Sequence, residues 1–264
     1  NIPSNEIDTW ARVQGDRFQN MVIRGFHTEL EAVYEEYNIG LSSDWRKVYA
    51  ALFAKLFPTH PYGTQTTIGL GEHLKNPSIT NIKNYFNKYY VPNNIAICLS
   101  GDLDPDKTVA SIEKYFGNWK PSAHIDVPQF PAQPALTAPV DTTVVGKEAP
   151  MLFMGWRAEP SNSLQMDTLE IVAQLLSNGQ AGLFDLDLSQ KLKVQEVSAG
   201  IADMDEYSVF YVYGQPKSGQ TLQEVRSLAL SEIEKLKKGN FSDDLLPSIV
   251  NNYKRYYYTQ LDNN

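Results

Sequence analysis

Cysteine, long apolar stretches and positive charge are scarce in this 264-residue sequence. Its single cysteine, Cys98, has no partner for an intrachain disulfide, and its place in the apolar run Ile95–Leu99 predicts a small core residue. No apolar stretch approaches the ~18 residues of a membrane-spanning helix, so no membrane span is expected. Positive charge is also scarce: 23 Lys and Arg against 31 Asp and Glu give a net charge of −8. A nucleic-acid site needs clustered cations that displace counterions from phosphates, so we expect no nucleic-acid partner.

Proline is concentrated in one place. Five prolines fall within residues 121–139, where they preclude a helix or a central strand and predict a linker. The linker separates residues 1–120 from residues 140–264. With 42% hydrophobic and 20% charged residues, the chain can bury one large core or two moderate ones.

Hydrophobic periodicity predicts the secondary structure on both sides of the linker. Before it we expect helices near 4–20, 27–37, 43–57, 78–90 and 104–116, and a strand at 95–100. After it we expect strands at 142–145, 151–156, 196–202 and 208–214, and helices at 164–176, 220–238 and 243–258. Asp104 is the expected N-cap of its helix, with Pro105 in the first turn. The predicted fold class is α+β, with antiparallel or mixed sheets covered by helices.

Two glutamates in the second helix are seven residues apart. At roughly 100° per residue, this spacing returns to nearly the same azimuth, so Glu29 and Glu36 share one face and two carboxylates are available to one site. Glutamates at this spacing are also typical of a plain solvent-exposed helix face. The spacing alone leaves both interpretations open.

Short segments along nearly the whole chain share their order and spacing with one family. They are Phe26–Glu29, Leu41–Asp44, Phe57–Gly63, Thr67–Gly69, Leu74–Asn76, Tyr89–Asn94, Ser100–Asp104, Met151–Trp156 and Phe241–Leu245. Together they resemble the M16 family of zinc metallopeptidases, which includes insulin-degrading enzyme, pitrilysin and the mitochondrial processing peptidase. The resemblance implies M16-like modules of helices on sheets, peptide hydrolysis and a peptide substrate.

The resemblance also implies roles for the two glutamates. M16 enzymes hold zinc with both histidines of an H-x-x-E-H motif and a glutamate roughly 75 residues later, and the motif's own glutamate is the general base. The family's E-x(6)-E pattern places the metal ligand on Glu36 and a supporting acid on Glu29. Three protein ligands would leave one zinc position for the attacking water.

The sequence departs from the family pattern in one respect. None of its four histidines begins an H-x-x-E-H motif; they are His27, His60, His73 and His124. The family spacing places the motif about 40 residues before Asn1. We therefore expect an internal segment that is inactive alone and that supplies the third zinc ligand and part of the substrate chamber in an intact peptidase. The alternatives are a non-catalytic M16-like partner or scaffold subunit, and a binding domain that shares only the fold.

An internal comparison bears on domain organisation. Phe26–Leu30 aligns with Phe241–Leu245 at an offset of 215 residues, although five positions leave a chance match open. If the match is real, residues 1–120 are the C-terminal half of a zinc-bearing module and residues 140–264 the N-terminal half of a metal-free one. The same offset places Asn251, a poor zinc ligand, opposite Glu36.

Two further segments contain residue types that are common in binding sites. In the family, the loop matching His60–Gly63 lies near the active site, so His60 and Tyr62 are candidates for the substrate cleft; a proline-glycine turn is the simpler interpretation. The tyrosine-rich segment Tyr253–Tyr258 is interpreted as a packing face rather than a nucleic-acid site, because the chain is acidic. Beyond a peptide substrate, the expected partners are a second copy of the chain or an M16-like subunit.

Overall fold

The computed structural model describes residues 1–261; residues 262–264, the end of the predicted 140–264 half, lie outside the described residues. The chain forms two compact units. The first contains Asn1–Ile39 and Thr67–Pro131, and the second contains Gly40–Thr66 and residues 132–261. The units therefore alternate along the sequence. The assignment of residues 1–120 and 140–264 to halves of two modules stays a prediction.

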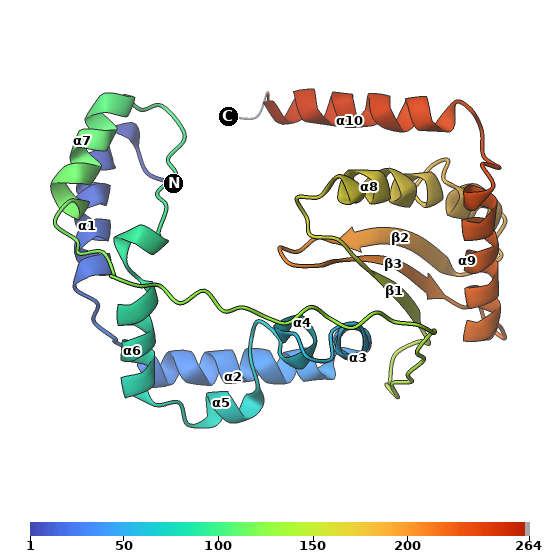
Figure 1. Ribbon diagram of the computed structural model, residues 1–264, viewed down its shortest axis with the longest axis horizontal. Coiled ribbons are helices and arrows are strands. Elements are labelled where there is room, and N and C mark those ends of the chain that lie inside the picture. Colours follow the sequence, from blue (N-terminus) through green and yellow to red (C-terminus); the bar gives the residue numbers. More distant parts are fainter. Residues whose placement is uncertain (262–264) are drawn as a thin grey trace. The chain divides into compact units, whose positions relative to one another are not determined.

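The first unit is helical (Figure 1). Its elements are η1 (Ser4–Glu6), α1 (Ile7–Gln19), α2 (Phe26–Ser42) as far as Ile39, α5 (Gly71–Lys75), α6 (Ile79–Tyr89), η2 (Pro92–Asn94) and α7 (Pro105–Phe116). Side-chain caps begin two of these helices as their sequences predict. Ser78 accepts a hydrogen bond from the Asn81 backbone, and Asp104 accepts one from the Lys107 backbone.

Helices α1 and α7 pack closely because Gly15 has no side chain. A Cβ atom on Gly15 would lie 2.9 Å from the carbonyl oxygen of Tyr115. The Gln19 amide then donates to that same oxygen at 2.8 Å, which joins the C-terminal turns of the two helices. A polar side chain thus satisfies a helix-end carbonyl that has no partner within its own helix.

The second unit combines helices with a small sheet. Its elements are α3 (Asp44–Leu56), α4 (Pro61–Thr64), β1 (Leu152–Ala158), α8 (Leu164–Leu176), the π-helical turn η3 (Asp185–Ser189), β2 (Glu196–Ala202), β3 (Ser208–Gln215), α9 (Leu222–Lys237) and α10 (Leu245–Leu261). The strand order is β1-β3-β2 and both pairings are antiparallel. In the register, Phe210 of β3 lies opposite Trp156 and Ile201. The α+β class is confirmed.

Both faces of the sheet are covered by helices (Figure 1). On one face, Val197 and Val212 pack with Leu176 of α8 and Val225 of α9. On the other, Val209 packs with Phe53 and Phe57, which α3 and the residue after it contribute. Because successive side chains of a strand point to opposite faces, the central strand β3 contributes to both cores. Helix α3, which precedes the proline-rich segment, therefore covers one face of a sheet whose strands follow that segment.

Several element predictions need correction. Residues 95–100 and 142–145 form no strand, and neither segment has a ladder partner among residues 1–261. A strand is stable only when a neighbouring strand satisfies the hydrogen bonds of its backbone, and local periodicity does not show whether such a neighbour exists.

Cys98 is exposed instead of buried in a core. The segment between the expected helices at 43–57 and 78–90 contains the short helices α4 and α5, which hydrophobic periodicity does not predict. Among the described residues, no helix combines the length and apolar character needed to cross a membrane.

Candidate functional site

The predicted metal-binding acids lie on α2. Glu29 and Glu36 are both exposed, and their spacing of seven puts the two carboxylates on one helix face. Helix α5 packs against α2 at Tyr37, because a Cβ atom on Gly71 would lie 2.8 Å from the Tyr37 ring. The residue next to Glu36 is therefore in close contact with another helix, while Glu36 itself faces solvent.

These acids do not form a complete metal site by themselves. Within residues 1–261, no three His, Cys, Asp or Glu side chains are grouped closely enough to hold a metal ion. A zinc site needs three or four protein ligands, most often histidine, cysteine and carboxylate. The described residues thus offer no complete zinc site, and Glu36 and Glu29 do not fit a zinc ion without ligands from elsewhere.

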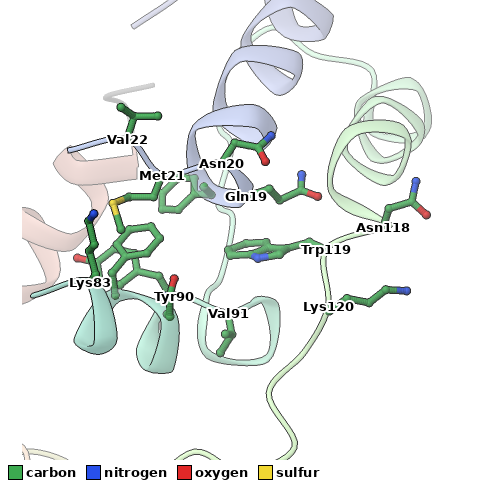
Figure 2. Close-up of a pocket in the computed structure, with 13 residues that line it drawn as sticks. Gln19, Asn20, Met21, Val22, Lys83, Tyr90, Val91, Asn118, Trp119 and Lys120 are labelled. Atoms are coloured by element: carbon green, nitrogen blue, oxygen red, sulfur yellow. The ribbon is translucent and has the colours of Figure 1, made fainter. Parts of the chain in front are cut away.

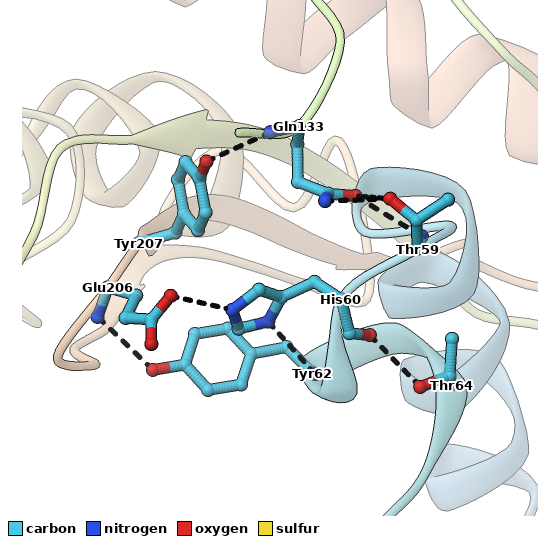
Figure 3. A network of polar contacts seen from close by, with 7 residues as sticks. All are labelled: Thr59, His60, Tyr62, Thr64, Gln133, Glu206 and Tyr207. Carbon is cyan, nitrogen blue, oxygen red and sulfur yellow. Dashed lines mark hydrogen bonds and ion pairs between the residues drawn. The ribbon is translucent and has the colours of Figure 1, made fainter. Parts of the chain in front are cut away.

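The structure places His60 in the interior of the second unit (Figure 3). His60 is only 1% exposed. Its Nδ1 accepts a hydrogen bond from the Tyr62 backbone at 3.2 Å, and its Nε2 lies 2.9 Å from Oε2 of Glu206. Because Nδ1 is an acceptor, the ring proton is assigned to Nε2, which donates to the carboxylate. His60 is also the N-cap of α4, in agreement with the predicted turn.

Three segments of the second unit meet around this histidine (Figure 3). The Tyr62 hydroxyl accepts a hydrogen bond from the Glu206 backbone at 3.2 Å, in the connection between β2 and β3. The Gln133 backbone donates to the Tyr207 hydroxyl at 3.0 Å, and the Gln133 side chain pairs with Thr59. The network therefore joins the α3–α4 turn, the proline-rich segment and the β2–β3 hairpin.

Glu206 is the accessible group of this network. Its side chain is 44% exposed, whereas the imidazole that it contacts is 2% exposed. Sequence reasoning did not identify Glu206. The available signal was the acidic stretch Asp203–Glu206 at the tip of the predicted strand pair, which places several charges in one short turn. The structure thus brings His60 and Tyr62 together, and adds a surface carboxylate.

A second buried polar contact fixes α3 on the sheet. Asp44, at the first turn of α3, accepts hydrogen bonds from the backbone of Lys147 and, at 2.7 Å, of Glu148, shortly before β1. Lys47 forms an ion pair with the same carboxylate at 2.8 Å. The hydrogen bond from Lys47, followed by the one from the Glu148 backbone, lowers the pKa of Asp44 from 3.8 to about 2. This site positions α3, and no substrate role follows from it.

Comparison with known proteins identifies relatives of the chain. Residues 78–253 match the family described as "Peptidase M16 inactive domain". The Helicobacter pylori protein named "Zinc protease PqqE" is 24% identical over 224 residues, which cover 81% of this chain and 49% of that protein. The chain thus spans about half the length of this relative.

Solved structures show the same fold. A crystal structure of a protease from Helicobacter pylori has a TM-score of 0.85 and 21% sequence identity, and the match covers 99% of this chain and 65% of that one. The peptidase M16 inactive domain from Pseudomonas fluorescens has a TM-score of 0.73 and 13% identity, over 92% of this chain and 59% of its own. At these identities the likeness establishes the fold alone.

Proposed function

Because the chain belongs to the M16 peptidase family, we propose that it is a segment of a zinc-dependent endopeptidase that hydrolyses peptides or unfolded polypeptides. The observation that carries the proposal is the exposed Glu36, with Glu29 on the same face of α2, in a chain of this family. A relative named as a zinc protease supports it. The family that matches is described as inactive, and the described residues hold no complete metal site, so the segment alone is expected to be inactive.

In this proposal α2 has one chemical task, which is to present a carboxylate. A zinc ion bound there would polarise a peptide carbonyl and make its bound water acidic. Glu36 would hold the ion, and Glu29 would orient the ligand set from two turns away on the same face. Two histidines of an H-x-x-E-H motif in a longer protein would supply the other protein ligands.

His60 and Tyr62 have an indirect place in this proposal. His60 is buried, so its contribution to a peptide cleft is to hold the β2–β3 hairpin through Glu206. Tyr62 holds the same hairpin through the Glu206 backbone. The hairpin tip, and Glu206 with it, is the part of this network that a peptide can contact.

The test measures bound zinc in the parent protein extended about 80 residues upstream, beside two variants. Glu36→Gln removes the proposed ligand, and Glu35→Gln is the matched control one position away, about 100° around the helix. We expect about one zinc per chain in the wild type and in Glu35→Gln, and none in Glu36→Gln.

Elemental analysis provides the readout without an activity assay. Full zinc occupancy in Glu36→Gln would contradict the ligand assignment. Absence of zinc from the extended wild type would contradict the peptidase proposal itself, and would favour a non-catalytic subunit that works beside an active one. Equal zinc loss in both variants would mean that Glu36 acts through the stability of α2 and is not a ligand.

A further inference from the structure

An open groove lies on the first unit, on residues that the peptidase proposal does not use (Figure 2). Its volume is about 810 Å³, and its walls come from the end of α1, from α6 and from residues 118–120 after α7. All of these residues belong to the same compact unit. The volume is within the range of known ligand sites, although the groove is open on one side instead of enclosed.

Aromatic rings form a row along this groove. Phe86 stacks on Tyr90 at a centroid distance of 4.3 Å. Phe18 then lies 6.4 Å from Tyr90 and 5.9 Å from Trp119, so four rings from three chain segments are in succession. Tyr90 is 42% exposed. Such a row offers flat apolar surface to proline and aliphatic side chains, the mode by which aromatic-lined grooves bind extended peptides.

The charge of the groove is opposite to the charge of the chain. The charged residues of its lining are Lys83 and Lys120, and the lining contains no carboxylate, whereas the whole chain has a net charge of −8. The Asp16 carboxylate accepts a hydrogen bond from the side-chain amide of Asn20 at 2.8 Å, but Asp16 itself does not line the groove. Across the part of the chain that the structure describes, neither lysine forms an ion pair, so both ammonium groups are available to a ligand.

We propose that this groove binds an acidic, extended segment of polypeptide. The ring row would hold its apolar or proline side chains, and the two lysines would pair with its carboxylates. Asn87 and Asn118 are exposed lining residues whose amides both donate and accept, which suits the alternating groups of a peptide backbone. Two lysines are too few for a nucleic-acid strand, whose binding requires cations along the backbone.

The test is fluorescence anisotropy with the 264-residue chain and labelled peptides of about ten residues, which span ~33 Å when extended. Three peptides share one proline- and leucine-containing sequence and differ only in carrying Glu, Gln or Lys at the same positions. We expect the Glu peptide to bind about five- to tenfold more tightly than the Gln peptide, and the Lys peptide to bind most weakly. Added salt should reduce this difference.

The variants locate the binding. Lys83→Gln combined with Lys120→Gln should weaken the Glu peptide about five- to tenfold and leave the Gln peptide unchanged. Trp119→Ala should weaken both peptides. Lys75→Gln, at an exposed lysine of α5 outside the lining, is the matched control and should change nothing. Circular dichroism confirms that each variant is folded.

Four results would overturn the proposal. They are no saturable binding up to about 1 mM peptide, equal affinity for the Glu and Lys peptides, an undiminished affinity in the double lysine variant, and equally tight binding of a single-stranded oligonucleotide that the same variant abolishes. None of these measurements involves zinc or Glu36. The groove and the peptidase proposal therefore succeed or fail independently.

Discussion

At the scale of the residue, Asp44 shows how a single carboxylate links distant parts of the sequence. It is 5% exposed and bonds the backbone of residues 147 and 148, about a hundred positions further along the chain. The hydrogen bonds favour the ionised form, so they lower the pKa of Asp44 to about 2. Gly146 is needed beside it, because a Cβ atom there would lie 2.1 Å from Oδ2 of Asp44.

This pKa predicts how stability depends on pH. The pKa of Asp44 is lowered in the folded state, so its stabilising contribution is complete above the ordinary value of 3.8 and is lost as pH falls toward about 2. We expect Asp44→Asn to be less stable than the wild type at pH 6, and the difference to shrink between pH 4 and pH 2. Urea unfolding at a series of pH values measures it.

The control for Asp44 is Asp102→Asn, at an exposed position of the first unit. It should have the unfolding midpoint of the wild type across the same range. A stability difference between wild type and Asp44→Asn that stays constant from pH 6 to pH 2 would contradict the assigned pKa.

The same scale shows what the sequence could indicate about the candidate site. The turn at His60 was predictable, because proline and glycine follow within three residues. Its partner Glu206 was not, because the two are 146 residues apart and only the folded chain brings them together. The ring row of the groove was missed for the same reason, since Phe18, Tyr90 and Trp119 come from three separate segments. Glu36 and Glu29 were found because their spacing is local; their metal role stays a prediction.

At the scale of the element, the close contact of α1 and α7 at Gly15 makes a prediction. In an isolated helix, Gly→Ala gains about 1 kcal/mol of helix propensity. At Gly15 the new Cβ atom would lie 2.9 Å from the Tyr115 oxygen and 3.2 Å from the Tyr115 Cβ, so the helices would have to separate. We expect Gly15→Ala to lower the free energy of unfolding by about 1–3 kcal/mol, measured by urea denaturation.

Gly40 provides the matched control within a helix. A Cβ atom there would meet only the end of the flexible Arg46 side chain, at 2.8 Å from a guanidinium nitrogen, which can move away. Gly40→Ala should therefore be neutral or stabilising by up to about 1 kcal/mol. If Gly15→Ala were equally stabilising, the packing of α1 on α7 would not be as described.

The elements also show which part of the fold was predictable. Helices α3, α6 and α7 begin where the sequence indicates, because Ser43, Ser78 and Asp104 cap them locally. The hairpin of β2 and β3 was predictable as well, since each strand finds its partner next in sequence. The prediction of strands at 95–100 and 142–145 is wrong. A strand needs a hydrogen-bonded neighbour, and the sequence of a segment does not show whether the folded chain supplies one.

At the scale of the whole molecule, one boundary between the two compact units falls within the proline-rich segment, between Pro131 and Ala132. Residues 40–66 precede it, yet they belong with the sheet that follows it. The reason is hydrophobic: Phe53, Leu56 and Phe57 are all buried, and they pack on Val209 of β3. Composition locates a linker, but it does not show which apolar surfaces will cover each other.

Because residues 40–66 pack on the sheet, we predict that loss of this packing destabilises the second unit and leaves the stability of the first unit unchanged. Phe57 is fully buried between α3 and the sheet, so Phe57→Ala should cost about 3–5 kcal/mol. Hydrogen exchange measured by mass spectrometry should become faster in β1 and β3 and stay unchanged in α1 and α7. Leu164→Ala, at an 85% exposed position of α8, is the control and should leave all four elements unchanged. Equally accelerated hydrogen exchange in α1 and α7 would contradict this prediction and mean that the two units unfold together. Only a shared cooperative core could transmit the loss of the Phe57 side chain to helices that do not contact it.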